Sequence, residues 1–526
     1  MGTYINTGSF GFQSFRNSEY VDKSELIAVV NQTLFTEQRF SCVTRCRRFG
    51  KSMAARMLCA YYDHSCDSRH LFQDLQIAGD PSFEQHLNKY AVIYLDMTRF
   101  ITRFHDHTVV EHINEELSED IHAAYPDVPR KAGDDLMALL IRIAAATGEK
   151  FFFIIDEWDA ICREFKPDTK AMDDYLDWLR SMFKSYEGLS VFAGAYLTGI
   201  LPIKKYQTQS AMNNFQEYSM VDPMYMASYF GFTKKEVQAL AEKYHIDYDE
   251  LEKWYDGYQI GDEKHIFNPN SVMMALRSRR CRSYWAKTAA YETVADYITM
   301  NFDGLKDNII SMLAGETVRV NATKFQNDLA VIKSKDDVLT VLIHLGYLAY
   351  DDERRRCFVP NYEVWGELSN AVEETGWTEV IAALQQSEQL LHDTLAGNAE
   401  AVARGIDLAH DEHTSILSYN DENSLCCVLA IAYYAARDKY IVHREMATGK
   451  GYADLVLMPR KNTDSPAVII ELKKDHSVDE AISQIRQREY TAKVAQHTSD
   501  ILLVGICYDS KSKKHTCCIE PQKLSD

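Results

Sequence analysis

Four short apolar runs alternate with helical patterns in the first two hundred residues, and this alternation constrains the fold more than any other feature. The runs are RFSCV at 39–43, YAVIYLDM at 90–97, KFFFIIDE at 150–157 and LSVFAGAYLTG at 189–199. They are rich in β-branched and aromatic residues and almost continuously apolar, which is typical of strands buried on both faces. Segments with a helical pattern, such as SMAARMLCAYYDH and AMDDYLDWLRSMFKSY, separate them. We therefore predict an α/β domain with a parallel sheet and helices on both faces.

The segment TRCRRFGKS, residues 44–52, follows the first apolar run and ends like a loop that binds phosphate. In the pattern G-x-x-x-x-G-K-[ST], Gly50 would let the backbone approach the phosphates, Lys51 would reach the β and γ oxygens, and Ser52 would ligate magnesium. Arg45 stands where the first glycine of that pattern belongs. A GKS turn is common by chance, so this segment alone is a weak indication of a nucleotide site.

The third apolar run, FFFIIDEWD, ends in Asp156 and Glu157, which is the pattern of a Walker B segment. Asp156 would hold magnesium, and Glu157 would polarise the attacking water. The structural alternative is a buried strand whose last carboxylate caps the next helix. The GKS turn about a hundred residues upstream favours the nucleotide site. Thr198, at the end of the fourth run, stands where P-loop ATPases often have a polar sensor of the γ-phosphate.

Eight stretches between residues 15 and 295 form a specific, ordered set. They are YVDKSELI (20–27), TRCRRFGKS (44–52), LFQDLQI (71–77), IIDEWDAI (154–161), LTGILPIKK (197–205), YFGFTKKEV (229–237), KWYDGYQIG (253–261) and FNPNSV (267–272). On these stretches the chain resembles the bacterial AAA-ATPase-like family whose members carry a C-terminal PD-(D/E)xK nuclease-like domain. The resemblance implies a P-loop NTPase fold with a helical lid, with ATP and Mg2+ as cofactors.

The resemblance also bears on the opening of the loop. The family usually has arginine there, so Arg45 is its normal form. Cys46 stands where a proline is usual, and Pro202 stands where the family tends to have an arginine. The second difference removes one phosphate-sensing cation and leaves Lys204 or Lys205 as substitutes. The resemblance therefore supports nucleotide binding more strongly than hydrolysis.

Arginine clusters stand out because the chain is acidic overall. Lys and Arg number 57 against 77 Asp and Glu, and the formal charge of −20 argues against broad, non-specific adhesion to nucleic acid or anionic membrane. Any contact with nucleic acid must use local patches such as RSRRCR at 277–282 or ERRR at 353–356, although the commoner role of such runs is the solvated face of a helix or hairpin. Arg47 and Arg48 could either grip phosphate oxygens or pair with acidic residues of a neighbouring element and hold the loop shut.

Residues 296–395 have helical patterns interrupted by one hairpin, GYLAYDDERRRCFVPNYEV, with Asp351 and Asp352 at its turn. This connector could be a small winged-helix-like module whose wing carries Arg354 to Arg356, or a structural lid packed on the ATPase domain. The preceding WYDGYQIG is predicted to be a turn-and-core element rather than a ligand stack, because its Asp-Gly and Gly are turn signals beside aromatic residues.

From residue 396 onward the elements follow the order helix, strand, strand, strand, helix, strand, which is the core order of the PD-(D/E)xK nuclease fold. Asp454 lies near the start of one apolar strand, and Glu471-x-Lys473 ends the next. The two carboxylates can converge on one magnesium with the carbonyl of Leu472, while Lys473 orients or helps deprotonate the attacking water. Alternation places Glu471 and Lys473 on the same face of their strand. The alternative is an edge strand with solvated side chains.

Two further side chains agree with the nuclease interpretation. Glu422, on the preceding helix, matches the acidic residue that many nucleases of this superfamily add to the metal site. Gln484, on the following helix, matches a frequent supporting position. The family resemblance continues through HREMATGKGYADLVL and IIELK, and there Arg444 and Glu445 match positions for which strand pairing and contact with substrate phosphate both remain open.

At 526 residues the chain is too long for one ordinary core. We predict an AAA-ATPase-like domain with its lid at 1–295, a helical connector at 296–395 and a nuclease-like domain at 396–526. The sequence has no run of about 18 uncharged apolar residues and no basic segment followed by an apolar one at its start. We therefore expect a cytoplasmic protein without a membrane partner.

These observations predict an ATP-binding and ATP-hydrolysing protein coupled to a Mg2+-dependent nuclease, with Mn2+ as an alternative metal. DNA is favoured over RNA as the nucleic-acid partner, and ATPases of this type often assemble into homo-oligomers. Defence against mobile DNA, or carriage by it, suits the architecture by analogy. One alternative is a nucleotide-regulated scaffold with a catalytically silent nuclease fold, and another is a nuclease whose P-loop fold no longer binds nucleotide.

Overall fold

The computed structural model describes most of the chain in two compact units. One unit comprises Met1–Thr288 with Arg319–Glu367, and the other comprises Ala289–Val318 with Leu368–Asp526. The described residues are 2–523 except 105–107, 130, 132, 165–168, 204, 207–208, 211, 286–289, 301, 303, 314, 326–331, 375–377, 414–428, 430–431, 434–435, 437–439, 449–450, 460–464 and 488–499.

The first unit is built on a parallel five-stranded sheet in the order β2-β3-β4-β1-β7. Four strands lie where the apolar runs predict them: β1 (Phe40–Thr44), β2 (Ala91–Asp96), β3 (Phe151–Asp156) and β4 (Phe192–Gly199). The fifth, β7 (Gln216–Tyr218), pairs with β1 at the edge and is not predicted by the sequence pattern. Strand β4 lies between β1 and β3, so the ends of all three strands are adjacent.

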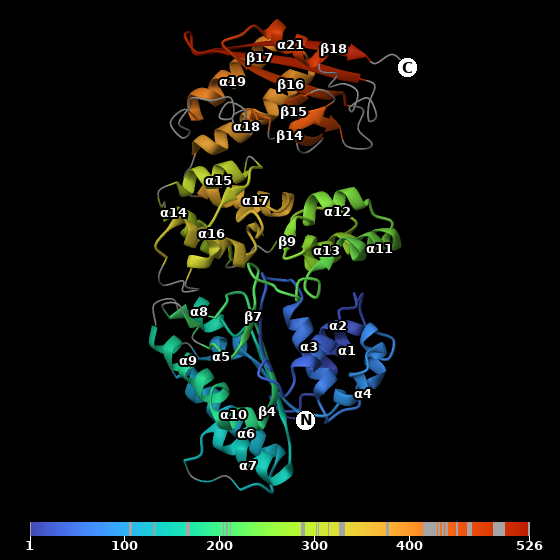
Figure 1. The fold of residues 1–526 in the computed structure, drawn as a ribbon, viewed down its shortest axis with the longest axis vertical. Helices are drawn as coiled ribbons and strands as arrows, with labels where there is room; N and C mark the ends of the chain where they lie inside the picture. Colours follow the sequence, from blue (N-terminus) through green and yellow to red (C-terminus); the bar gives the residue numbers. More distant parts are fainter. Residues whose placement is uncertain are drawn as a thin grey trace. The chain divides into compact units, whose positions relative to one another are not determined.

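Helices cover both faces of this sheet, as predicted (Figure 1). Side chains of β3 alternate between two buried cores, with Phe151, Phe153 and Ile155 in one and Phe152 and Ile154 in the other. The first core is completed by α5 (Met97–Arg103), α6 (Val109–Ala124), α7 (Leu136–Thr147) and α9 (Thr169–Phe183), and the second by α2 (Glu25–Thr33) and α3 (Lys51–Tyr62). Burial on both faces explains why the strands are continuously apolar.

Further short helices surround the sheet. They are α1 (Phe10–Arg16), α4 (Phe83–His86), α8 (Ala160–Glu164) and α10 (Tyr186–Val191), with the two-residue strands β5 (Lys205–Tyr206) and β6 (Gln209–Ser210) after β4.

A lid follows the sheet and has its own core around Val237, Leu251 and Phe267. It consists of β8 (Phe232–Thr233), α11 (Lys234–Tyr244), α12 (Tyr248–Tyr255), β9 (Tyr258–Ile260), β10 (Glu263–Phe267) and α13 (Pro269–Ser278). The WYDGYQIG segment is a turn between buried tyrosines, as predicted: Gly257 has a φ of +105°, and a Cβ there would lie 1.9 Å from the carbonyl oxygen of Pro360.

The predicted hairpin of the connector is present as β12 (Ala349–Asp351) and β13 (Arg356–Phe358). Strand β11 (Val318–Arg319) completes a sheet in the order β11-β13-β12. The other elements here are the 3-10 turn Ala322–Lys324, α16 (Lys335–Leu345) and α17 (Tyr362–Glu374). A Cβ at Gly346, between α16 and β12, would lie 2.6 Å from the Cβ of Cys46, so this turn packs directly on the TRCRRFGKS loop.

The second unit contains a five-stranded sheet in the order β14-β15-β16-β17-β18. The strands are β14 (Tyr440–Thr448), β15 (Gly451–Pro459), β16 (Ala467–Lys474), β17 (Asp500–Asp509) and β18 (Lys514–Lys523), and the helices are α14 (Ala290–Thr299), α15 (Leu305–Leu313), α18 (Thr378–Leu395), α19 (Ala399–His413) and α21 (Val478–Gln487). All neighbours are antiparallel except β16 and β17, which are parallel and joined through α21. This is the predicted nuclease order with one unpredicted edge strand, β18.

In the part of the chain that the structure describes, no helix is both long and apolar enough to cross a membrane.

Candidate nucleotide and nuclease sites

The TRCRRFGKS loop connects the end of β1 to the start of α3. Gly50 caps the N-terminus of α3 with a φ of +90°, a conformation that glycine adopts without strain. The first N–H groups of a helix have no partners within it and carry a partial positive charge. Lys51 and Ser52 are the first residues of α3. The second half of the loop therefore presents unpaired N–H groups at the position where the sequence predicts a phosphate site.

Arg45 has a structural role at the opening of the loop. Its side chain is 0% exposed, and its guanidinium donates to the carbonyl oxygens of Thr44, Tyr218 and Met226 at 2.9, 2.8 and 3.1 Å. It also lies over the ring of Phe230, 5.2 Å from the centroid. Arg45 therefore ties the loop to the edge of the sheet and faces away from the anion site.

The Lys51 ammonium lies inside the loop. Its side chain is 4% exposed, and its Nζ donates to the carbonyl oxygens of Arg45 and Cys46 at 3.0 and 3.1 Å. The nearest carboxylate oxygen in an ion pair is Oε1 of Glu157, at 3.8 Å. These bonds hold the predicted phosphate-binding cation at the start of α3, beside the predicted Walker B residues.

Asp156 is the centre of a buried hydrogen-bond cluster. Thr198 donates to its Oδ1 at 2.5 Å, Tyr94 donates to its Oδ2 at 3.0 Å, and the Ser52 hydroxyl also bonds the carboxylate. Burial raises the pKa of Asp156, although these hydroxyl groups oppose the shift. The structure thus brings together Ser52, Asp156 and Thr198, which lie on three different elements.

Glu157 adopts a left-handed conformation, with a φ of +55°, immediately after β3. Its Oε2 accepts from Arg163 at 2.5 Å, and its Oε1 faces Lys51. Burial acts to raise the pKa of Glu157, but Lys51, Arg163 and Arg47 together lower it. The side chain is therefore kept as a carboxylate next to the loop.

Arg163 is itself positioned by Asp159, a fully buried carboxylate. Asp159 also accepts from the backbone N–H groups of Ile200 and Leu201 at 3.1 and 2.9 Å, so it links α8 to the end of β4. Sequence reasoning assigned no role to either residue. Their i, i+4 spacing at the start of a helix is the signal that could have indicated the pair.

Arg47 and Arg48 differ in their surroundings. Arg48 is exposed and donates to the carbonyl oxygen of Tyr284 at 2.9 Å. Arg47 is half-buried, and burial followed by the nearby Arg163 lowers its pKa, while Glu157 opposes the shift. Pro202 is buried. Lys204 lies outside the described residues, and of Lys205 only the backbone is described.

A cavity of about 360 Å³ opens in front of the loop, entirely within the first unit. Its lining includes the predicted residues Arg48, Gly50, Lys51, Ser52 and Glu157. It also includes several residues that sequence reasoning did not assign to a nucleotide site, among them Tyr20, Lys23, Tyr229, Met273 and Arg277. The cavity thus has a polar end at the start of α3 and apolar walls between the N-terminal segment and α13.

The nuclease constellation is assembled on β15, β16 and α21. Antiparallel pairing of Leu455 with Ile470 places Asp454 next to Glu471, and Oδ2 of Asp454 accepts from the N–H of Leu472 at 2.7 Å. Glu471 is 1% exposed. Its Oε1 lies 3.1 Å from Nζ of Lys473 and also accepts from the amide of Gln484. The structure therefore brings together four of the predicted nuclease residues.

The alternation of β16 explains this arrangement. Ile469 belongs to the core that also contains Ile482 and Ile485 of α21, whereas Ile470 belongs to the opposite core. Glu471 and Lys473 lie on the same face as Ile469, so they point to α21 and Gln484. Glu422 lies outside the described residues, and only the backbone of Arg444 and Glu445, within β14, is described.

Comparisons with known proteins find a family match for each of the two domains. Residues 6–208 match the model of a family described as predicted AAA-ATPase, and residues 421–517 match the PD-(D/E)XK nuclease superfamily. The first domain is therefore similar to a predicted AAA-ATPase, and the last is similar to the PD-(D/E)XK nuclease superfamily. A relative from Azotobacter chroococcum mcd 1, an uncharacterized protein in the vnfD 5′ region, is 23% identical over an alignment of 392 residues. The match covers 71% of this chain and 72% of the relative.

Two solved structures match over long stretches with low scores. The ORC2 protein of Aeropyrum pernix, in ADPNP and ADP complexes, is 10% identical and covers 69% of this chain and 98% of its own, with a TM-score of 0.31. A DNA replication initiation factor is 11% identical and covers 80% and 96%, with a TM-score of 0.26. Scores this low do not establish a shared fold over those lengths.

The nuclease domain has a donor set that fits a hard divalent cation. Asp454 and Glu471 supply carboxylate oxygens, and Leu472 supplies a main-chain carbonyl between Glu471 and Lys473. Mg2+ and Mn2+ prefer such oxygen ligands. In the AAA-ATPase domain, Ser52 and Asp156 likewise offer a hydroxyl and a carboxylate that already meet.

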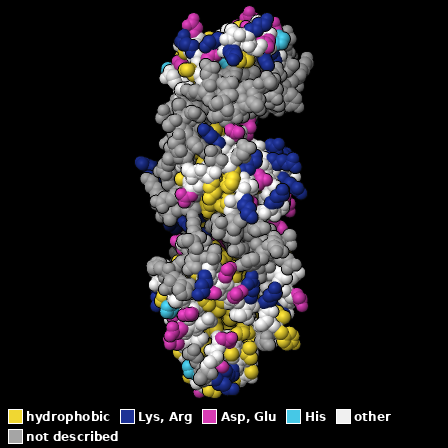
Figure 2. Space-filling view, turned by 90° about the vertical axis from the view of Figure 1, so that its left-hand side faces the viewer, with side chains coloured by type: hydrophobic (Ala, Val, Ile, Leu, Met, Phe, Trp, Pro, Cys, Tyr) yellow, Lys and Arg dark blue, Asp and Glu magenta, His cyan; other side chains and the backbone are white. Residues whose placement is uncertain are grey.

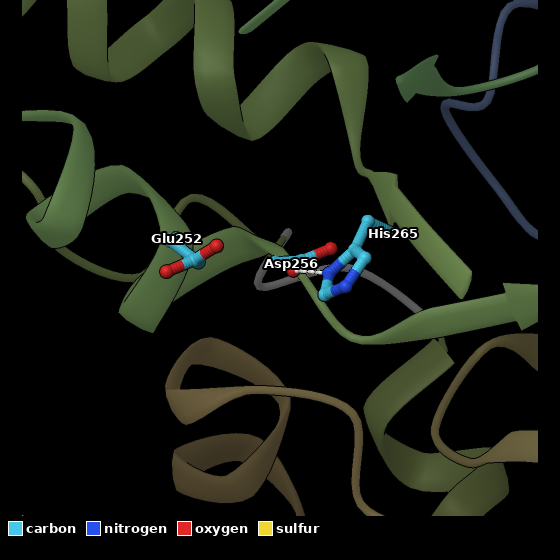
Figure 3. Close-up of side chains that lie close together, drawn as sticks. All are labelled: Glu252, Asp256 and His265. Atoms are coloured by element: carbon cyan, nitrogen blue, oxygen red, sulfur yellow. Dashed lines mark hydrogen bonds and ion pairs between the residues drawn. The ribbon is translucent and has the colours of Figure 1, made fainter. Parts of the chain in front are cut away.

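Glu252, Asp256 and His265 form a further polar cluster in the lid (Figure 3), and their potential ligand atoms lie within 4.8 Å of one another. Each group already has a protein partner. His265 Nδ1 lies 2.7 Å from Oδ2 of Asp256, and Oε1 of Glu252 accepts from Tyr248 at 2.8 Å and from Lys234 at 3.2 Å. We interpret the cluster as a hydrogen-bonded brace between α12 and β10.

Proposed function

We propose that this protein binds and hydrolyses ATP in its AAA-ATPase domain and, in a coupled step, cleaves phosphodiester bonds with its nuclease domain. The favoured substrate is DNA, with RNA second, and the favoured metal is Mg2+, with Mn2+ as an alternative. The observation that carries the proposal is the convergence of Lys473 and Gln484 on Glu471, with Asp454 on the neighbouring strand. Defence against mobile DNA, or carriage by it, and assembly into homo-oligomers are the proposed biological setting.

The nucleotide would occupy the cavity in front of α3. Its phosphates would take the place of the backbone carbonyl groups that now accept from Lys51, and the N–H groups at the start of α3 would bind phosphate oxygens. Arg48 and Arg277 are further cations on the cavity wall. Ser52 and Asp156 would hold Mg2+. Glu157, which its cationic neighbours keep ionised, would orient the attacking water.

In the nuclease domain, Asp454, Glu471 and the Leu472 carbonyl would hold the divalent cation. When bound, that cation polarises a phosphoryl oxygen and lowers the pKa of a water. Lys473 lies 3.1 Å from Glu471 and would release that contact in part to orient the water or to stabilise the phosphate. Gln484 fixes the Glu471 carboxylate from α21. A buried carboxylate that accepts two hydrogen bonds is held in one position, as a catalytic site requires.

Cleavage is tested with the full chain on plasmid, linear and single-stranded DNA and on RNA, with Mg2+ or Mn2+, with and without ATP. Asp454→Ala and Glu471→Gln should each lower the cleavage rate at least 100-fold, because each removes a metal ligand. Glu480→Gln, an exposed carboxylate on the same helix as Gln484, is the matched control and should cleave normally. Absence of wild-type cleavage under every condition, or normal cleavage by Asp454→Ala, would contradict the nuclease proposal.

Nucleotide use is tested separately. Lys51→Ala should lower ATP affinity roughly 10- to 100-fold, because it removes a charge-assisted hydrogen bond from a buried site. Lys184→Ala, an exposed lysine of the same unit, is the control. Binding is measured with a fluorescent ATP analogue and turnover by phosphate release. Unchanged binding and turnover in Lys51→Ala would reject the nucleotide site and leave the nuclease proposal standing.

A further inference from the structure

The segment RSRRCR, residues 277–282, forms the end of α13 and the loop that follows it. Its four arginines, Arg277, Arg279, Arg280 and Arg282, are all exposed, and the segment contains no acidic residue. This concentration of positive charge is unusual in a chain with a formal charge of −20. On the face drawn in Figure 2, Lys and Arg side chains lie close together in one region, whereas basic and acidic side chains are intermixed elsewhere.

The backbone of this arginine loop is held by buried groups. The hydroxyl of the buried Tyr255 donates to the carbonyl oxygen of Arg282 at 2.9 Å and accepts from its N–H at 3.0 Å. Tyr284 donates to the carbonyl oxygen of Arg280 at 2.8 Å. The carboxylate of Glu363 accepts from the N–H of Tyr284. The side chains of the loop therefore project from a fixed backbone.

The guanidinium groups themselves are not paired with carboxylates of the described residues. Within the described part of the chain, the four arginines of the loop make no ion pair and donate no side-chain hydrogen bond. The Arg282 guanidinium instead lies over the ring of Tyr284, 5.2 Å from its centroid. Carboxylates do lie nearby, since Glu250 and Asp247 act electrostatically on Cys281 within the loop, but among the described residues neither forms an ion pair with the four arginines. The remaining concentration of like charge favours an anionic partner from outside the loop.

The hairpin between β12 and β13 offers an internal comparison. Its turn also has three consecutive arginines, but Asp351, Asp352 and Glu353 precede them, so the six residues sum to zero formal charge. The backbone N–H of Arg354 donates to Asp351, and the Arg354 guanidinium lies 3.9 Å from the same carboxylate. Of the two basic segments that the sequence singles out, only the loop after α13 is strongly positive.

We propose that Arg279, Arg280 and Arg282 form a contact surface for the phosphate backbone of nucleic acid. Guanidinium groups bind phosphate oxygens in pairs. A polyanion with closely spaced phosphates therefore fits these closely spaced cations better than a protein with scattered carboxylates does. Contacts to phosphate position a strand without reading its sequence, so binding here is not sequence-specific. The inference rests on the proposed function for the presence of nucleic acid. Arg277, which lines the nucleotide cavity, joins this surface to that site.

The test uses the full chain and fluorescence anisotropy of labelled duplex DNA, single-stranded DNA and duplex RNA, in a chelator that prevents cleavage. The loop variant Arg279→Gln/Arg280→Gln/Arg282→Gln keeps Arg277 and so preserves the cavity wall. Each phosphate contact contributes about 0.9 to the slope of log K against log salt on duplex DNA, so the variant should lose roughly 2 to 3 from that slope. Its affinity at moderate salt should fall roughly 10- to 100-fold.

The hairpin variant Arg354→Gln/Arg355→Gln/Arg356→Gln is the matched control, because it removes the same charge from another arginine run. It should bind each probe within about twofold of wild type, since its positive charge is already balanced. Nucleotide binding and the thermal midpoint of the loop variant should equal those of wild type. Loss confined to one probe would identify the class of strand that this surface binds.

Three results would overturn the inference: no binding by wild type, an unchanged salt slope in the loop variant, or equal losses in both variants. Because binding is measured without a divalent cation, the affinity can be determined even if the chain cleaves nothing. A failed nuclease assay and a failed loop variant are therefore separate outcomes.

Discussion

Arg45 is a fully buried guanidinium whose hydrogen-bond acceptors are backbone carbonyl groups of three segments. Burial lowers its pKa to about 10, and the three carbonyl groups supply the hydrogen-bond acceptors that a buried cation requires. Arg45→Ala should reduce the free energy of unfolding by about 3 to 5 kcal/mol, since it leaves a cavity and unpaired carbonyl groups. Urea denaturation measures the change. Arg48→Ala, at an exposed neighbour, should change stability by less than about 1 kcal/mol. Similar losses of stability in the two variants would contradict the structural role of Arg45.

Glu363 is a buried carboxyl that accepts from the N–H groups of Tyr284 and Trp285. Burial raises its pKa to about 7, from an ordinary value of 4.5. Between these two values the folded chain keeps a proton that the unfolded chain has released, so the free energy of unfolding falls as pH rises, by about 3 kcal/mol in total. Glu363→Gln cannot titrate. Urea midpoints at pH 5 and pH 8 should therefore show wild type losing stability relative to the variant, and parallel curves would contradict the shift.

At the scale of elements, the turn between α16 and β12 is packed against the phosphate loop. Gly346 has a φ of +90°, and a Cβ there would lie 2.6 Å from Cys46 and 3.1 Å from Trp285. Gly346→Ala should therefore destabilise the chain by about 2 to 4 kcal/mol and weaken ATP binding by displacing the loop. Denaturation and nucleotide titration measure the two effects. Gly366→Ala, inside α17 with no atom within 4 Å of the added methyl, should instead stabilise by up to about 1 kcal/mol.

Some strands of this fold can be predicted from the sequence, and others cannot. The four long strands of the first sheet and the order of the nuclease strands follow from apolar runs, because burial on both faces leaves a clear pattern. Strand β7 is only three residues, Gln216–Tyr218, and is specified by pairing with β1. Strand β18 contains Pro521, which argues against a strand in general but is tolerated at the sheet edge.

The residues of the candidate sites likewise fall into those that a motif identifies and those that only the folded chain brings together. Residues adjacent in motifs, such as Lys51 or Glu471, are identified by chemistry and spacing. Two of the three carbonyl partners of Arg45, those of Tyr218 and Met226, come from residues more than a hundred positions away, and Arg277 reaches the cavity only because the lid folds back on the loop. Long-range packing of this kind leaves no local pattern in the sequence.

The whole molecule has two compact units, each with its own buried cores. Chains with separate cores commonly unfold in more than one step, so we expect two thermal transitions. A nucleotide stabilises only the folded state that binds it, by about 3 kcal/mol at one hundred times its dissociation constant. ADP at that concentration should raise the transition of the unit with the phosphate loop by a few degrees and leave the other unchanged. Differential scanning calorimetry separates the two.

Two variants assign those transitions to their units. Lys51→Ala should reduce the nucleotide-dependent shift without altering the second transition, because Lys51 and its partners, the loop carbonyl groups and Glu157, belong to the first unit. Ile470→Ala, in the core of the second unit, should lower the other transition alone, since it deletes buried methyl groups there. A single transition that moves as a whole with nucleotide would mean that the two units unfold as one. Nucleotide binding would then stabilise the nuclease domain together with the ATPase domain, which would be one form of coupling between them.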